Sequence, residues 1–214
     1  MQNSDFLDGL ANDHTEIKKP ESLFAKILKW MIINILCVGS GLAIFGFRED
    51  WVNLFTNPLN LLQNILIILS VISSGFAAFT MARPGQLNKK TIPFILLPFL
   101  LWLGLLILKI FISGYNPAMF FKISLMCIKD ILIFGMIPSF ALIFFIKDGI
   151  VLKRGFFGLF ATLASFGIGA WASQFTCHSN DPVHILTWHF LPLVVLSYLG
   201  VFLATKFKKF LTKI

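Results

Sequence analysis

Long apolar runs without charge dominate the chain, and short segments between them carry nearly all of its Asp, Glu, Lys and Arg. These uncharged runs cover 30–47, 52–82, 91–108, 131–146, 155–180 and 183–205. Most are close to or longer than the ~18 residues that indicate a membrane-crossing helix. They are continuous rather than alternating, which excludes the strands of an outer-membrane barrel. The pattern predicts helices at about 24–46, 60–82, 91–112, 124–146, 155–175 and 185–206.

The predicted fold class is therefore all-α, a polytopic membrane bundle with six transmembrane helices. Of the residues, 57% are hydrophobic and 13% are charged, against about 45–50% and about 25% in soluble domains. No loop reaches the ~50 residues of a separate soluble domain. We expect three parts: an acidic amphipathic leader at 1–22, a transmembrane domain at 23–206 and a basic tail at 207–214.

The distribution of basic residues predicts the orientation of the bundle. Six spans place both termini on one side, together with all but four of the 18 Lys and Arg residues. The four on the other side are Arg48, Lys109, Lys122 and Lys129. By the positive-inside rule both termini are expected in the cytoplasm, and the net charge of +8 needs no nucleic-acid partner.

Residues inside the predicted spans indicate how the helices pack. Small side chains recur every four residues in the fifth span, at Ala161, Ser165, Gly169 and Ser173, and favour close helix packing. Pro93, Pro98, Pro138 and Pro192 are expected to kink their helices. Lys109 and Lys129 lie near enough to helix ends to extend toward the membrane surface. The only pair of opposite charges within a span, Lys129 with Asp130, lies near the outer end of the fourth span, which argues against an ion pump.

Two of the three cysteines are candidates for sensing a signal. The topology places Cys127 and Cys177 at the outer ends of their spans, whereas Cys37 lies within the first span. A bridge between Cys127 and Cys177 would close a loop of about 50 residues and constrain the unfolded chain by roughly 4 kcal/mol. Two interpretations stay open. The thiols are structural, bridged or unpaired, or they form a redox- or metal-responsive pair.

The outer loop after the fifth span carries candidate metal ligands. Cys177, His178, Asp181 and His184 combine thiol, imidazole and carboxylate groups that suit a soft or borderline metal, and His189 follows in the last span. Their spacing matches no standard zinc pattern, and Asp181 before Pro182 also fits a turn that starts a helix. We therefore expect no cofactor.

Known catalytic motifs are missing from the chain. It has no Cys-x-x-Cys, His-Glu-x-x-His or Gly-x-Ser-x-Gly sequence and no phosphate loop. The protein is therefore expected not to be an enzyme.

The leader is a candidate binding segment. Phe6, Leu7 and Leu10 fall on one helical face, while Asp5 and Asp13 lie elsewhere. Four acids and no basic residue precede the first lysine, so anionic lipid would repel this segment. Two interpretations remain, a disordered acidic tail and a short helix that folds into a groove on a basic protein partner.

Four groups of residues spread over nearly the whole chain form a recognisable pattern: Asp5-Phe6-Leu7 with Leu10 and Asp13, Ala82-Arg83-Pro84-Gly85, Cys127 with Pro138, and Cys177 with Asp181-Pro182 and Trp188. With these residues the chain resembles the NrsF family of six-span bacterial anti-sigma factors. The resemblance implies a multi-pass protein of the bacterial inner membrane whose partners are an extracytoplasmic-function sigma factor and the lipid bilayer, without direct nucleic-acid contact.

On this resemblance, the leader residues Asp5, Phe6, Leu7, Leu10 and Asp13 hold the sigma factor until a stress signal arrives. The hypothesis is that oxidation or metal capture at Cys127 and Cys177 shifts the last three spans and weakens this hold. A small transporter or channel, or a structural membrane protein, is the alternative.

Overall fold

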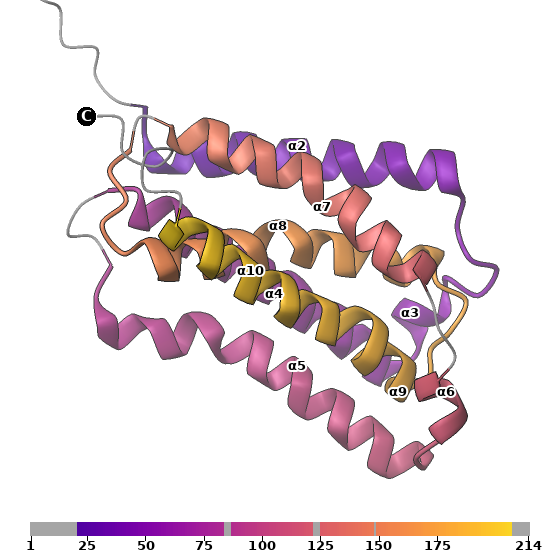
Figure 1. Cartoon of the computed structure of the whole chain (residues 1–214). Helices are drawn as coiled ribbons and strands as arrows, with labels where there is room; N and C mark the ends of the chain where they lie inside the picture. Colours follow the sequence, from indigo (N-terminus) through magenta and orange to yellow (C-terminus); the bar gives the residue numbers. More distant parts are fainter. Residues whose placement is uncertain (1–20, 84–86, 122–124, 148, 207–214) are drawn as a thin grey trace, which may run out of the picture.

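The computed structural model describes residues 21–83, 87–121, 125–147 and 149–206, and all regular elements within these ranges are helices (Figure 1). Six helices are long and apolar enough to cross a membrane, which confirms the prediction of six spans. They are α2 (Leu23–Phe45), α4 (Pro58–Met81), α5 (Ile92–Ser113), α7 (Leu125–Ile146), α8 (Arg154–Thr176), and a last span built from α9 (Pro182–Ile185), the π-helical turn η2 (Leu186–Phe190) and α10 (Leu191–Lys206). Three short elements lie between spans: α3 (Asn53–Thr56), η1 (Lys89–Thr91) and α6 (Pro117–Phe121).

Local sequence explains where several of these helices begin and end. The side chains of Ser22, Asn57 and Asp181 accept hydrogen bonds from the first backbone N–H groups of α2, α4 and α9. Gly46 and Gly114 follow the last residues of α2 and α5 with φ of 80° and 83°, a region that disfavours other residues. The capped starts and glycine stops keep the spans short and the connections tight.

The six spans alternate in direction, so the bundle has two ends (Figure 1). We call the end where α2 begins and α10 finishes the terminal end, and the opposite one the distal end. The terminal end contains Leu23, Met81, Arg154 and Lys206, and the distal end contains Phe45, Pro58, Thr176 and Pro182. The first and last described spans therefore start and finish at the same end, as an even number of spans requires.

Helix α8 lies at the centre of the bundle and packs against α7, α4 and α10. Ser165 and Ser173 are fully buried, and a Cβ added at Gly169 would collide with the backbone of Ile131 in α7. The close packing predicted for this small-residue strip is confirmed. Gly158 similarly faces the backbone of Gly200 in α10. Helices α7, α8 and α10 therefore approach one another with little room between their backbones.

The last span is irregular near Pro192, where a kink was expected, because η2 widens it by a π turn. Leu191 N–H donates to the carbonyl of Leu186, five residues earlier, directly before Pro192. Proline has no N–H to continue the normal ladder, so a wider turn at this point accommodates it. His189 lies inside this turn, which determines how the distal end is built.

Candidate functional site

Four side chains at the distal end form a buried cluster of sulfur and nitrogen atoms. Cys127 lies in the first turn of α7, Cys177 follows α8, His184 lies in α9 and His189 lies in η2. One ligand atom from each lies within 4.8 Å of all the others, and all four residues are buried. The two Sγ atoms are 3.3 Å apart, and His184 Nε2 lies 3.6 Å from Cys127 Sγ and 3.3 Å from Cys177 Sγ. We call these residues the Cys–His cluster.

The π turn brings the two histidines together. On an ideal α-helix, side chains five residues apart point in directions about 140° apart. The wider turn of η2 reduces this separation, and the rings of His184 and His189 lie 5.8 Å apart between centroids. Pi turns of this kind are frequent at functional sites.

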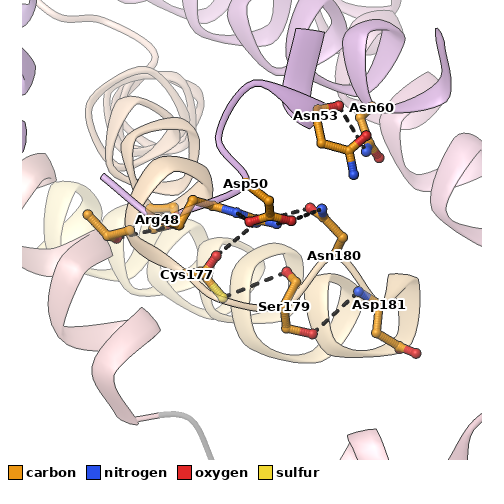
Figure 2. A network of polar contacts seen from close by, with 10 residues as sticks. Arg48, Asp50, Asn53, Asn60, Cys177, Ser179, Asn180 and Asp181 are labelled. Atoms are coloured by element: carbon orange, nitrogen blue, oxygen red, sulfur yellow. Dashed lines mark hydrogen bonds and ion pairs between the residues drawn. The ribbon is translucent and has the colours of Figure 1, made fainter. Parts of the chain in front are cut away.

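Arg48 fixes the loop that carries Cys177 (Figure 2). Its guanidinium donates to the Cys177 carbonyl at 2.8 Å and to Asn180 Oδ1 at 3.0 Å. Nε and Nη2 hold both carboxylate oxygens of Asp50 at 2.5 and 2.6 Å. The Arg48 side chain is 1% exposed, so this clamp between the α2–α3 connection and the Cys177 loop is desolvated on the arginine side.

A chain of hydrogen bonds joins a buried lysine to the Cys–His cluster. Lys109 Nζ donates to Asn60 Oδ1 and to Gln63 Oε1, both at 2.9 Å. Gln63 Nε2 donates to Gln174 Oε1 at 3.0 Å, and Gln174 Nε2 lies 3.2 Å from His189 Nδ1. We call this chain the Lys109 relay. Lys109 is 7% exposed, so its side chain points into the bundle. The prediction that it extends toward the membrane surface was wrong.

Two groups in the distal loops have shifted pKa values. The hydrogen bond with Cys127 lowers the pKa of the Cys177 thiol to about 7, against the opposing effect of burial. Hydrogen bonding to Arg48 lowers the pKa of the Asp50 carboxyl below its ordinary value. Cys177 therefore becomes a thiolate near neutral pH, the form that reacts with oxidants and binds metals.

The structure brings together only part of the candidate set. Cys127, Cys177 and His184 meet in the cluster. His178 is exposed, and Asp181 accepts hydrogen bonds from the N–H groups of Val183 and His184 as the cap of α9. The leader residues Asp5, Phe6, Leu7, Leu10 and Asp13 lie outside the described residues.

Sequence reasoning left several residues of the site unassigned. His189 stands outside the predicted ligand set because its position next to His184 depends on the π turn. Arg48 and Lys109 count only as charges in the sequence, and Gln63 and Gln174 are 111 residues apart. The sequence held one indication of Lys109: a basic residue inside an apolar span is costly to bury unless it has polar partners, so such partners could have been sought in the neighbouring spans.

A cavity of about 400 Å³ lies beside the cluster. Its lining includes Cys127, Cys177 and His184 together with Asp130 and Thr176. Thr176 donates to Asp130 Oδ2 at 2.7 Å, so this acid is held at the wall of the cavity. Small reagents or ions have a route to the sulfur atoms through this space.

No curated protein and no solved structure matches the chain. The model of one protein family, described as NrsF, negative regulator of sigma F, matches residues 10–210. That match covers almost the whole length and agrees with the six membrane-type helices. The chain belongs to the NrsF family, a family of regulatory proteins that act as negative regulators of a sigma factor.

Proposed function

We propose that the protein is a membrane-bound anti-sigma factor of the bacterial inner membrane. Its leader sequesters an extracytoplasmic-function sigma factor in the cytoplasm, through Phe6, Leu7 and Leu10 with Asp5 and Asp13 around them. A periplasmic oxidant or metal acts at Cys127 and Cys177 and causes release. The observation that carries this proposal is the position of the cysteines at the distal end, opposite the end where the first span begins.

Helix α7 offers a physical link between the two ends. Cys127 lies at its distal start, and near its other end the Phe145 carbonyl accepts a hydrogen bond of 2.8 Å from Lys26 Nζ of α2. Midway, Trp30 Nε1 donates to the Pro138 carbonyl at 2.9 Å. A displacement of α7 at Cys127 therefore moves the helix that directly follows the leader.

The start of α2 is also tied to its surroundings. Arg83 Nη2 donates to the carbonyl of Glu21 at 2.8 Å, and the Glu21 side chain pairs with Lys29 at 2.6 Å. Glu21 is the first residue that the structure describes and lies at the end of the leader. Movement of α2 relative to α4 changes these contacts at the point where the leader leaves the bundle.

Oxidation of the two thiols changes the geometry of the distal end. Two-electron oxidation by a thiol-specific oxidant forms the S–S bond, releases two protons and requires the sulfurs to approach from 3.3 Å to ~2.05 Å. A complete swing from bound to free needs a difference of about 5.5 kcal/mol between the two folded conformations. Because the loop-closure entropy of a disulfide acts on the unfolded chain, the oxidised pair supplies this difference through the displacement of Cys127 and Cys177.

Co-purification tests the anti-sigma function. The full chain is expected to retain a sigma factor in membranes, and deletion of residues 1–16 is expected to abolish this. Alanine at Phe6, Leu7 and Leu10 is expected to give the same loss, because it removes the apolar face. Alanine at the polar positions Gln2 and Asn3 is the matched control and is expected to retain the partner. Retention after the deletion would overturn the assignment of the leader.

A further inference from the structure

We propose that Cys127, Cys177, His184 and His189 bind one thiophilic metal ion in a four-coordinate site. The class of ion is a d¹⁰ cation that accepts two thiolates and two imidazoles, which Zn²⁺ and Cu⁺ both do. This inference deepens the proposed sensor and rests on the proposed function for its regulatory meaning. Metal binding itself is measured without the sigma factor.

The spacing of the donor atoms fits a tetrahedral site. Bond lengths of about 2.3 Å to sulfur and about 2.0–2.1 Å to nitrogen place tetrahedral ligand atoms roughly 3.3–3.8 Å apart. The sulfur–sulfur distance is 3.3 Å and the two distances from sulfur to His184 Nε2 are 3.3 and 3.6 Å. Shifts of a few tenths of an ångström bring these three atoms around one ion.

His189 supplies the fourth donor. Its ring is fully buried, and in the described part of the chain its Nε2 atom has no hydrogen bond of ordinary length, while the Cys127 thiol interacts with this imidazole. An unpartnered buried nitrogen is costly unless it binds a ligand. Since Nδ1 lies 2.9 Å from Ser173 Oγ, Nε2 is the atom left to coordinate.

Ser173 provides the outer contact that a metal-bound histidine needs. With an ion on Nε2, the ring carries its proton on Nδ1 and donates it to Ser173 Oγ, whose own proton goes to the Ala170 carbonyl at 2.9 Å. The Gln174 amide nitrogen, 3.2 Å from Nδ1, only donates and opposes this arrangement. Metal binding therefore turns the Gln174 amide.

Charge and access also suit a cation. The two thiols lose their protons to solvent on binding, and the ligand set then carries a charge of about −2, which Zn²⁺ neutralises and Cu⁺ halves. The cavity beside the cluster reaches three of the four ligands, and its wall carries both Asp130 and Lys129, so the thiolates rather than the wall supply the negative charge. The buried clamp of Arg48 holds the loop of Cys177 in place for coordination.

Cobalt substitution tests the site on the full chain, reduced and purified in detergent. Co²⁺ is expected to bind once per chain with the strong visible bands of a tetrahedral site and a thiolate charge-transfer band, and Zn²⁺ is expected to displace it. In a parallel anaerobic arm, Cu⁺ is titrated against a chromophoric chelator, and binding of one Cu⁺ per chain is expected there as well. Absence of a thiolate–cobalt band in the reduced parent protein would overturn the proposal.

Single substitutions test whether the metal has four protein ligands or only the two thiols. His184→Ala and His189→Ala are each expected to weaken Co²⁺ binding by about 100-fold or more, and Ser173→Ala by about 10–100-fold. His178→Ala and Cys37→Ser are matched controls outside the cluster and are expected to leave binding unchanged. Equal affinity in the parent, His184→Ala and His189→Ala would contradict the assignment.

X-ray absorption spectroscopy of the zinc-loaded parent protein needs no substitution, so misfolding of a variant cannot affect its result. We expect two sulfur and two nitrogen neighbours at the distances above, and a shell without nitrogen would refute the site. A protein that holds the sigma factor but binds no metal would contradict only this inference. A protein that binds metal but holds no sigma factor would contradict the proposed function.

Discussion

Replacing Lys109 by methionine is expected to tighten metal binding, although the substitution removes a buried hydrogen-bonding group. An ammonium group only donates, so Lys109 orients Gln63 and Gln174 such that an N–H group faces His189 Nδ1. A metal on Nε2 requires a proton on that same Nδ1 atom. The Lys109 relay therefore holds the imidazole in the form that does not coordinate.

The magnitude follows from the one hydrogen bond at stake. Without Lys109 the side-chain amides of Gln63 and Gln174 can turn, and the Gln174 N–H group then no longer opposes a proton on His189 Nδ1. A neutral hydrogen bond contributes about 0.5–1.5 kcal/mol, which corresponds to roughly 2- to 12-fold tighter binding. Loss of a positive charge near the bound cation acts in the same direction. Methionine fills a similar volume, so a large loss of packing is not expected.

The assay is competition of Co²⁺ or Zn²⁺ against a chelator, with the parent protein and Lys109→Met in parallel. Lys206→Met removes an exposed lysine at the terminal end, far from the Cys–His cluster, and is expected to change the affinity little. Thermal unfolding of each variant shows whether the bundle is intact. Weaker binding by an intact Lys109→Met protein would refute the reasoning about the Lys109 relay.

Three further predictions follow from individual contacts. The rate of Cys177 alkylation, measured by mass spectrometry, is expected to rise with pH around a midpoint near 7, because the thiol is protonated and slow to react below it. Cys127→Ala is expected to raise this midpoint. Gly169→Ala is expected to destabilise the bundle by about 1–3 kcal/mol, since its Cβ meets the backbone of Ile131; thermal unfolding should show no such loss for Gly39→Ala, which has open space around it. Arg48→Lys keeps the charge but not the fork of hydrogen bonds, and cobalt titration is expected to show about 10-fold weaker binding.

The sequence was sufficient to predict the spans and the packing strip. Apolar length and the positions of Lys and Arg are local properties, so the boundaries of all six spans could be placed within a few residues. The repeat of small residues around Gly169 likewise needs only helical periodicity. These features depend on neighbours along the chain, which is why periodicity alone reveals them.

The site could be predicted only in part, because its geometry depends on contacts between distant segments. A regular helix places His184 and His189 on different faces, and only the π turn before Pro192 brings them together. Arg48 and Cys177 are 129 positions apart in the sequence, which gives no indication of their contact. In the sequence Asp181 was a candidate both for a metal ligand and for the turn before a helix, and the structure shows the helix cap.

Release of the sigma factor from membranes tests most directly whether the distal cysteines control binding at the other end. Vesicles carrying the full chain and its bound sigma factor are treated with a disulfide-forming oxidant or with Zn²⁺, and the sigma factor that remains bound is measured. The account predicts release from the parent protein and from Cys37→Ser, and retention by Cys127→Ser and Cys177→Ser. Equal release from all four proteins would contradict it.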